Sequence, residues 1–262
     1  MSLDANSALA GTWPRLVLVG LTAGLFAALF GVGGGVVMVP LLTVLLGYDT
    51  KVATATSLAA IIVTATVGVI AHGALGNVAW GYAVLIGLPA VVGVLAGLWI
   101  KERITTHTLT VGFAAMLAVV AIWLVSKPVA SEAASVSLDA GRGVAVAALG
   151  FVAGTLAGLF GVGGGILFVP ALTLIIGVPQ LRAEGASLLA IIPVSLLGSW
   201  RQHKTGTIRW GAAGIMGAAS VATAVAGAFI ADATPPRTLR ILFAVLMLIT
   251  AAQLVWRSRS ST

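Results

Sequence analysis

Residues 28–47 read ALFGVGGGVVMVPLLTVLLG and residues 158–177 read GLFGVGGGILFVPALTLIIG, so one pattern occurs twice at an offset of 130 residues. Each copy holds three consecutive glycines in an otherwise apolar stretch, with a proline five residues after the last glycine. Glycine loses the most conformational freedom in a helix, and proline lacks the backbone N–H donor. The pattern therefore predicts two equivalent interruptions of helical structure in a duplicated chain.

The composition places most of the chain in a membrane. Of the 262 residues, 60% are hydrophobic and 8% are charged, whereas soluble domains carry about 25% charged residues. The mean hydropathy is +1.14. Several apolar runs approach the length of about 20 residues that crosses a bilayer as a helix; they are residues 58–70, 83–100, 108–125, 208–231 and 239–256. We therefore expect an all-α, polytopic membrane protein embedded in the lipid bilayer.

The same composition argues against several function classes. The net charge of +7 does not indicate nucleic-acid binding, because the basic residues stand singly or in small groups between apolar runs. The chain has no cysteine, no paired carboxylates and no histidines at metal-ligand spacing. A phosphate-binding loop needs Gly-Lys-Ser/Thr, and here Val36 or Ile166 follows the glycines. We therefore expect no enzyme activity, no cofactor and no metal.

The duplication extends beyond the glycines. At the same offset, Ser57 matches Ser187 and Trp80 matches Trp210. The most polar stretch of the chain, residues 127–142, lies between the two copies and is typical of a loop outside the membrane. The predicted organisation is a first transmembrane repeat (1–130), a linker (131–141) and a second transmembrane repeat (142–262).

Each repeat contains five apolar segments, which in the first repeat are residues 15–31, 35–47, 54–74, 78–100 and 108–125. One helix over residues 15–47 would be about 50 Å long, against a hydrocarbon core of about 30 Å. We therefore expect a broken or re-entrant helix at the glycines, and we predict that Pro40 and Pro170 are helix breaks. Whether the two pieces cross fully or re-enter, the chain ends on the side where it began.

The number of crossings in each half is then odd, and the second repeat is inverted relative to the first. In this scheme the 14 Lys and Arg residues divide nine to five, and the positive-inside rule places the N- and C-termini, which lie on the richer side, in the cytoplasm. The alternative treats residues 15–47 as one crossing. It gives eight helices in two parallel four-helix repeats and a weaker division of eight to six.

The two glycine triplets are the predicted substrate-binding residues, together with Ser57 and Ser187; the triplets are Gly33, Gly34, Gly35 and Gly163, Gly164, Gly165. A helix that opens on glycine exposes unpaired N–H groups at the positive end of its dipole, which suits an anion. Helix packing is the alternative role of a glycine. We expect that role at Gly20, Gly24, Gly93, Gly97, Gly150, Gly154 and Gly158.

Hydroxyl and ionisable groups supply further candidates. Ser57 and Ser187 could donate to an oxyanion or could cap and bond the adjacent helical turn. His72, Arg182 and Glu184 are candidates for gating or for attracting the anion, because ionisable residues in membrane segments are often functional. All three lie near predicted segment ends, so we expect them at the solvated interface. Arg201 and His203 belong to a basic cluster that could attract an anion or anchor the helix on the cytoplasmic side.

The chain resembles the TauE/SafE family of sulfite exporter or sulfonate permease-like membrane proteins. The resemblance rests on LFGVGGGVVMVP (29–40), LFGVGGGILFVP (159–170), ATATSL (53–58) and AEGASL (183–188). It implies a carrier for a small organosulfur anion such as sulfite, a sulfonate or sulfoacetate, in a bacterial cytoplasmic membrane. It leaves the anion, the direction of transport, the coupling ion and a possible homo-oligomer open.

The leading hypothesis is thus a secondary transporter that exports a small organosulfur anion by alternating access. Export suits an anion, because each negative charge that leaves gains about 2.3 kcal/mol per 100 mV of inside-negative potential. The alternatives are an anion channel and a non-transporting membrane subunit of a sulfur-metabolism complex. The short loops offer such a complex little docking surface.

Overall fold

The structure is a computed structural model that describes residues 12–126 and 140–259, and every regular element in these two ranges is helical. The elements are α2 (Trp13–Phe30), α3 (Gly35–Leu46), α4 (Thr50–Ala74), α5 (Trp80–Arg103), α6 (Thr106–Ser126), α7 (Ala140–Phe160), α8 (Gly165–Pro170), the π-helix η1 (Ala171–Ile176), α9 (Gln180–Lys204), α10 (Trp210–Asp232) and α11 (Pro236–Arg259). The all-α prediction is confirmed. Most of the predicted linker lies outside the described residues, and its last two residues, 140 and 141, belong to α7.

Eight helices of the described chain are long and apolar enough to cross a membrane, and two shorter apolar helices accompany them. The short ones are α3 and the combined stretch of α8 and η1, which follow the two glycine triplets. With 12 residues, α3 rises about 18 Å, about half of the roughly 37 Å that the 25 residues of α4 span. The polytopic membrane prediction is therefore confirmed, with four long segments and one short segment in each half.

The chain reverses at each glycine triplet. Gly31, Gly33 and Gly34 have φ values of 68°, 71° and 89°, a region that glycine enters without steric cost. After this reversal α3 runs back beside α2, and the Arg15 side chain at the start of α2 donates to the carbonyl oxygen of Leu45 at 3.3 Å. Residues 15–47 therefore form a hairpin that ends on the face where it began, as expected, and they are not one crossing.

The two prolines do not make these breaks. Pro40 lies inside α3, which continues to Leu46, so the prediction that it breaks the helix is wrong. Proline removes one helical hydrogen bond, and membrane helices tolerate this loss because neighbouring groups satisfy the freed backbone. Pro170 ends α8, but the chain passes directly into the π-helix η1. The glycines alone therefore reverse the chain.

Equivalent helices of the two halves run in opposite directions. Lys101 at the end of α5 donates both to the carbonyl oxygen of Lys51 and to Gln202, so the start of α4 and the end of α9 share one face. At the other face the N–H of Ala79 donates to the carbonyl oxygen of Arg182, which joins the start of α5 to the start of α9. Hence α4 and α9, which occupy matching places in the duplication, are antiparallel.

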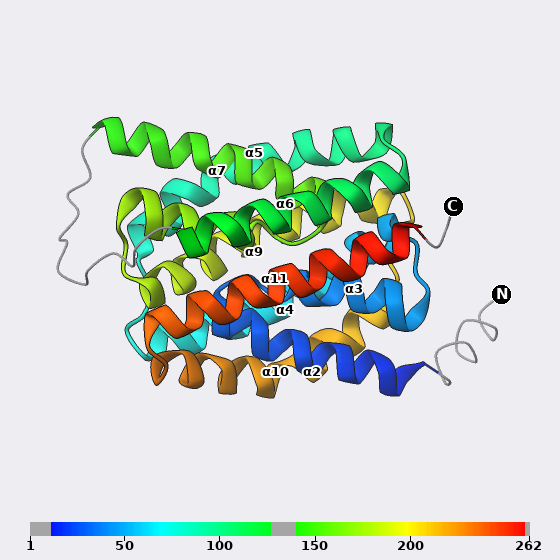
Figure 1. Cartoon of the computed structure of the whole chain (residues 1–262), viewed down its shortest axis with the longest axis horizontal. Coiled ribbons are helices and arrows are strands. Elements are labelled where there is room, and N and C mark those ends of the chain that lie inside the picture. The colour runs from blue at the N-terminus through cyan, green and yellow to red at the C-terminus, as the bar shows by residue number, and fades with distance from the viewer. Residues whose placement is uncertain (1–11, 127–139, 260–262) are drawn as a thin grey trace.

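We call the face that carries Lys51 and Lys101 the basic face and the other the opposite face. Seven of the Lys and Arg side chains that the structure describes lie on the basic face: Arg15, Lys51, Lys101, Arg103, Arg201, Lys204 and Arg209. Three lie on the opposite face, namely Arg182, Arg237 and Arg240. The start of α2 and the end of α11 both lie at the basic face, on the right of Figure 1.

The helices pack as two bundles that each draw on both halves of the sequence. The first bundle is α2, α4 and α10, and the second bundle is α5, α7 and α9. In Figure 1, α2 and α10 lie along the bottom, α5 and α7 lie along the top, and α6 and α11 cross between them. The bundles meet where α4 packs on α9. Because each bundle contains helices from both halves, neither half of the sequence forms a bundle by itself.

Glycines let the helices of each bundle approach closely. A Cβ atom on Gly24 would lie 2.5 Å from the carbonyl oxygen of Ser220 in α10. In the second bundle, a Cβ atom on Gly97 or Gly154 would overlap the backbone of the partner helix, α7 or α5. All seven glycines expected to serve packing face a partner backbone in this way. That prediction is confirmed, and it accounts for the α2–α10 and α5–α7 contacts.

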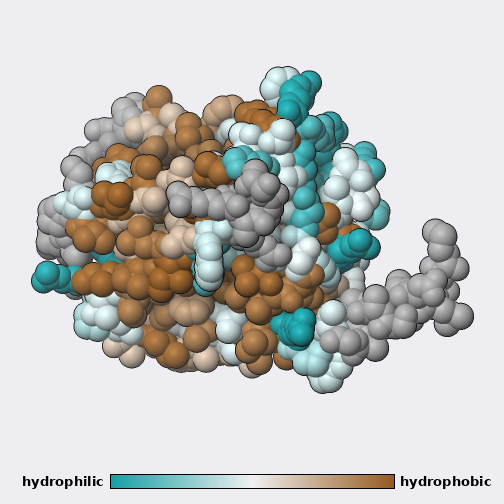
Figure 2. All heavy atoms as spheres, turned by 45° about the vertical axis from the view of Figure 1, so that its right-hand side comes forward, coloured by the Kyte–Doolittle hydropathy of each residue, from teal (hydrophilic) through white to brown (hydrophobic). Residues whose placement is uncertain are grey.

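The outer surface is apolar along most of the length of the helices. Figure 2 shows a broad hydrophobic area across the helices, with hydrophilic residues gathered toward the right, where the basic face comes forward. Large apolar side chains such as Leu88, Val119 and Ile122 are 63% to 67% exposed. Exposure of such a large apolar area to water is unfavourable, whereas its contact with lipid tails is not. The surface thus agrees with a protein surrounded by the bilayer.

We predict that Gly154→Ala destabilises the protein because the added methyl group has no room against the backbone of Ala90. Such overpacking costs roughly 1–3 kcal/mol, which lowers the midpoint of thermal unfolding in detergent. The matched control is Gly214→Ala in α10, where nothing lies within 4 Å of the added atom. There the change favours the helix slightly. Equal melting temperatures for the two variants would contradict the packing argument.

Candidate anion site at the hinge crossing

The two glycine reversals, which we call hinge 1 (residues 31–34) and hinge 2 (residues 161–164), lie against each other. A Cβ atom on Gly35 would lie 2.6 Å from Cα of Val162, and one on Gly165 would lie 2.5 Å from Cα of Val32. Both distances are too short for any residue with a side chain. The triplets therefore bring two stretches of main chain into direct contact, and we call this place the hinge crossing.

Each hinge also packs on a helix of the other half. A Cβ atom on Gly31 would lie 2.5 Å from Cα of Glu184 in α9, and Gly161 makes the equivalent close approach to Thr54 in α4. Thr54 and Glu184 match each other at the offset of 130. The hinges are thus held between α4 and α9, where the two bundles meet.

Hydroxyl groups bind the carbonyl groups of hinge 1. The Ser187 hydroxyl donates to the carbonyl oxygen of Gly31 at 2.6 Å, and the Thr64 hydroxyl donates to that of Gly33 at 2.6 Å. Both side chains are fully buried. These two bonds fix the orientation of the peptide groups in the hinge and satisfy their acceptors.

The N–H groups of the two glycine triplets have no such partners. Among the hydrogen bonds of residues 12–126 and 140–259, none has its donor at the N–H of the six predicted binding glycines: Gly33, Gly34, Gly35, Gly163, Gly164 and Gly165. All six residues are buried. Buried main-chain donors are almost always paired, and an unpaired one costs about as much as a lost hydrogen bond. The crossing therefore concentrates unsatisfied donors in the interior.

Buried hydroxyl groups without a hydrogen-bond partner occur on α4 and α9. Ser57, Ser195 and Ser199 are buried, and in the part of the chain that the structure describes their hydroxyl groups form no hydrogen bond. Ser195 lies close to hinge 2, since a Cβ atom on Gly163 would be 3.5 Å from its hydroxyl oxygen. The matched pair Ser57 and Ser187 thus behaves asymmetrically, because only Ser187 is engaged with a hinge.

Two isoleucines close the crossing. A Cβ atom on Gly33 would lie 3.0 Å from Cγ2 of Ile61, and one on Gly163 would lie 2.9 Å from Cγ2 of Ile191. Ile61 and Ile191 are equivalent in the duplication and are both fully buried. Their side chains separate the hinges from solvent in this conformation, so the crossing is occluded.

The ionisable candidates are placed differently from expectation. His72 is fully buried, and its Nε2 lies 2.8 Å from the carbonyl oxygen of Ala28. Glu184 is also fully buried; its Oε1 accepts from Gln180 at 2.8 Å, while no hydrogen bond of the described residues reaches its Oε2. The interfacial location expected for these two residues is wrong, because α2 and hinge 1 cover them. Arg182 is exposed, as expected.

The basic cluster lies at the surface of the basic face, away from the hinges. Arg201 and His203 are exposed, and His203 Nδ1 accepts from the indole N–H of Trp210 at 3.0 Å. Lys204 stands 3.9 Å over the ring of Trp200. His203 and Lys204 are therefore engaged with interfacial tryptophans, whereas Arg201 lines a small cavity described below.

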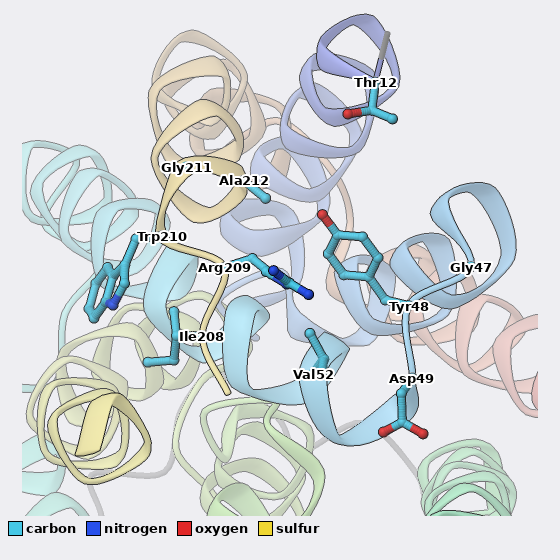
Figure 3. A pocket seen from close by; sticks show the side chains of 10 residues that line it. All are labelled: Thr12, Gly47, Tyr48, Asp49, Val52, Ile208, Arg209, Trp210, Gly211 and Ala212. Carbon is cyan, nitrogen blue, oxygen red and sulfur yellow. The ribbon is translucent and has the colours of Figure 1, made fainter. Parts of the chain in front are cut away.

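A larger cavity of about 690 Å³ opens at the basic face, and we call it the vestibule. It lies between Thr12, residues 47–49, Val52 of α4 and residues 208–212. In Figure 3, Arg209 and Tyr48 extend toward each other across it, while Trp210 points away. Val52 is nine residues before Ile61 on α4, a separation of about 13 Å along the helix. The vestibule therefore ends well short of the hinge crossing.

Comparison with known proteins decides the family. The model of the family described as Sulfite exporter TauE/SafE matches residues 5–144 and 146–262. The chain belongs to the TauE/SafE family. It is accordingly a membrane transporter of that family, which agrees with the polytopic fold.

Relatives from distant organisms carry matching descriptions. A probable membrane transporter protein of Xylella fastidiosa (strain 9a5c) is 29% identical over 252 residues, covering 93% of this chain and 94% of that protein. The probable membrane transporter protein YunE of Bacillus subtilis (strain 168) is 30% identical over 220 residues, covering 74% and 80%. One from Methanocaldococcus jannaschii is 28% identical over 198 residues, covering 73% and 72%. TauE/SafE membership thus rests on matches along nearly the whole chain.

Sequence reasoning missed some residues of this candidate site. Ile61 and Ile191 were not singled out, although the offset of 130 pairs them, and the Thr64 hydroxyl was expected to cap or bond its own helix. Apolar residues in apolar helices carry no signal of their own, so only the duplication could have selected them. Lys101 was grouped with the charges that orient the chain, yet it is only 5% exposed.

The two equivalent serines should differ when each is replaced by alanine. Ser187→Ala leaves the carbonyl oxygen of Gly31 buried without a donor, which costs about 1–3 kcal/mol of stability. Ser57→Ala removes a hydroxyl that has no partner, so it should leave the melting temperature unchanged but weaken anion binding. Thermal unfolding with and without sulfite measures both quantities. A Ser57→Ala protein that sulfite stabilises as strongly as the wild type would exclude Ser57 from the binding site.

Proposed function

We propose that this protein is a secondary transporter that exports a small organosulfur anion, of the sulfite, sulfonate or sulfoacetate type, across the bacterial cytoplasmic membrane by alternating access. The anion binds at the hinge crossing. The observation that carries this proposal is the set of N–H groups of the six triplet glycines, which have no partner among the described residues and are buried between the two bundles.

The chemistry of the crossing favours an anion over a cation or a neutral solute. In hinge 1 the free main-chain groups are donors, because Ser187 and Thr64 already occupy the carbonyl oxygens of Gly31 and Gly33. Gly35 and Gly165 begin α3 and α8, so each adds the positive end of a helix dipole. An oxyanion accepts several hydrogen bonds at once, and the unpartnered Ser57 hydroxyl can add another.

The charge state of Glu184 affects whether an anion can occupy the hinge crossing. Its carboxyl group is buried beside hinge 1, and its one hydrogen bond within the described chain comes from the neutral Gln180 side chain. A carboxylate at this position would repel an anion in the crossing. We infer that Glu184 is protonated when the anion is bound, which makes it the residue through which a proton could accompany the anion.

Alternating access follows from the way the bundles are joined. The first bundle (α2, α4, α10) and the second bundle (α5, α7, α9) are matched by the duplication and meet at α4, α9 and the hinges. Two repeats of opposite orientation, within residues 1–130 and 142–262, would give the two faces equivalent opening motions. Rocking of one bundle against the other would then expose the crossing to each face in turn.

The direction of transport rests on charge. Seven of the described Lys and Arg side chains lie on the basic face and three on the opposite face, so the positive-inside rule makes the basic face cytoplasmic. The vestibule then faces the cytoplasm. An anion that enters there is driven outward by the membrane potential, at about 2.3 kcal/mol per charge and 100 mV.

Proteoliposomes that contain only this chain test the function. We expect vesicles loaded with unlabelled sulfite to take up labelled sulfite transiently against its gradient, since a carrier exchanges its substrate while a channel does not. An inside-negative potential should accelerate sulfite efflux. Flux that rises linearly with concentration and shows no exchange would indicate a channel. No flux of sulfite, taurine, isethionate or sulfoacetate would remove the transport proposal and leave a non-transporting role.

Hinge variants test the site. Gly33→Ala places a methyl group in the crossing, and we expect anion binding to weaken by roughly tenfold because donor N–H groups become shielded. Gly47→Ala is the matched control: its φ of 69° nearly equals the 71° of Gly33, but nothing lies within 4 Å of the added atom. Both variants carry the same backbone strain, so only Gly33→Ala should lose binding. Equal binding by the two would place the anion elsewhere.

A further inference from the structure

A second cavity, of about 220 Å³, opens at the basic face between α4, α5 and α9. We call it the Lys101 pocket. Its polar lining includes Lys51, Lys101, Glu102, Arg201 and Gln202. The volume is below the roughly 300–1,000 Å³ typical of pockets for drug-sized ligands. A small ion with a few waters is therefore the kind of ligand that fits.

The ammonium group of Lys101 is the centre of this pocket. Lys101 is only 5% exposed, although lysine is almost never buried without a partner. It donates to the side-chain oxygen of Gln202 at 2.5 Å and to the carbonyl oxygen of Lys51 at 3.3 Å. Both acceptors are neutral. The ammonium group can donate three hydrogen bonds, so one donor remains unused among the described residues, and no carboxylate in that part of the chain is hydrogen-bonded to it.

Gln202 supplies a second unused donor. Its side chain is 6% exposed, and its Nε2 has no hydrogen-bond partner among the described residues, although its Oε1 accepts from Lys101. A buried amide nitrogen without an acceptor loses its hydration and gains nothing in return. The two buried side chains of the pocket thus both have donors to offer and no acceptor to receive them.

The rim adds positive charge. Lys51 and Arg201 line the pocket, and the only acidic residue among the lining residues is Glu102, which is exposed to solvent. Asp49 lies nearby, but one of its carboxylate oxygens accepts from the N–H of Lys51 at 2.7 Å and caps α4. Three cationic groups therefore face one carboxylate across the cavity, which leaves an excess of positive charge.

We propose that the Lys101 pocket is a separate binding site for a small oxyanion. The ammonium group of Lys101 and the amide N–H of Gln202 hold the anion, while Lys51 and Arg201 attract it at the rim. The site shares only its class of ligand with the hinge crossing. Its place at the basic face puts it beside the vestibule, so it would raise the local concentration of the anion where transport begins.

Calorimetric titration of the purified full-length chain with sulfite, at constant ionic strength in detergent, tests the proposal. Lys101→Met keeps the length of the side chain and removes the ammonium group, so sulfite binding at this site should weaken by roughly tenfold or more. The matched control is Arg103→Met, which removes the same charge from the same helix. Arg103 lies outside the pocket, with its guanidinium group 3.5 Å over the ring of Trp99, and its loss should change affinity by less than about twofold.

Gln202→Glu keeps the test decisive if Lys101→Met fails to fold. The new carboxylate would pair with Lys101 and repel the anion, so we expect the site to be lost in a stable protein. The hinge variant Gly33→Ala should retain this site, which separates the two proposals. If sulfite binds Lys101→Met, Gln202→Glu and Arg103→Met equally, or does not bind the wild type away from the hinges, the Lys101 pocket is not an anion site.

Discussion

The constraint on which the whole structure depends is that lipid supplies no hydrogen bonds to the main chain. Within the described residues the helices satisfy it internally, but the two hinges cannot, because their peptide groups leave the helical geometry. Burying both hinges against each other, between α4 and α9, removes them from lipid. Ser187 and Thr64 then satisfy the carbonyl groups of Gly31 and Gly33, while the N–H groups of Gly33 and Gly34 have no partner among the described residues.

The two halves share a backbone plan but differ in their polar groups. Thr64 is matched by Val194, Glu184 by Thr54 and Lys101 by Ala231. Thr64, Glu184 and Lys101 are each buried and hydrogen-bonded, whereas Val194 and Ala231 are apolar and Thr54 carries a hydroxyl group in place of a carboxyl group. The hinge crossing is therefore symmetric in its glycines and isoleucines and asymmetric in its hydroxyl and carboxyl groups. An anion at the proposed site would meet two similar hinges but different polar groups on α4 and on α9.

Much of this fold could be predicted from the duplication. The remainder depends on how deeply individual side chains are buried, which the sequence does not show. The spacing of the glycines predicted both the hinges and the close packing between helices, because a residue without a side chain permits positive φ values and close approach of another backbone. The burial of His72 could not be read from its place near the end of α4, since it depends on how far α2 extends beside it, to the carbonyl oxygen of Ala28. The burial of Lys101 could not be predicted either, because a lysine near a helix end is usually solvated and anchors the helix at the membrane surface.

The occluded crossing also limits how the bundles can move. The proposed rocking would slide hinge 1 past hinge 2, and most of this contact is between main-chain atoms of glycines, with Val32 and Val162 as the side chains within the hinges. Ile61 and Ile191 lie on the two helices that separate, one on α4 and one on α9, and each touches both hinges. In the proposed alternating access, movement that parts α4 from α9 at one face would withdraw one isoleucine from the crossing while the other could stay in place. The contacts that would enclose an anion there are thus also placed to release it.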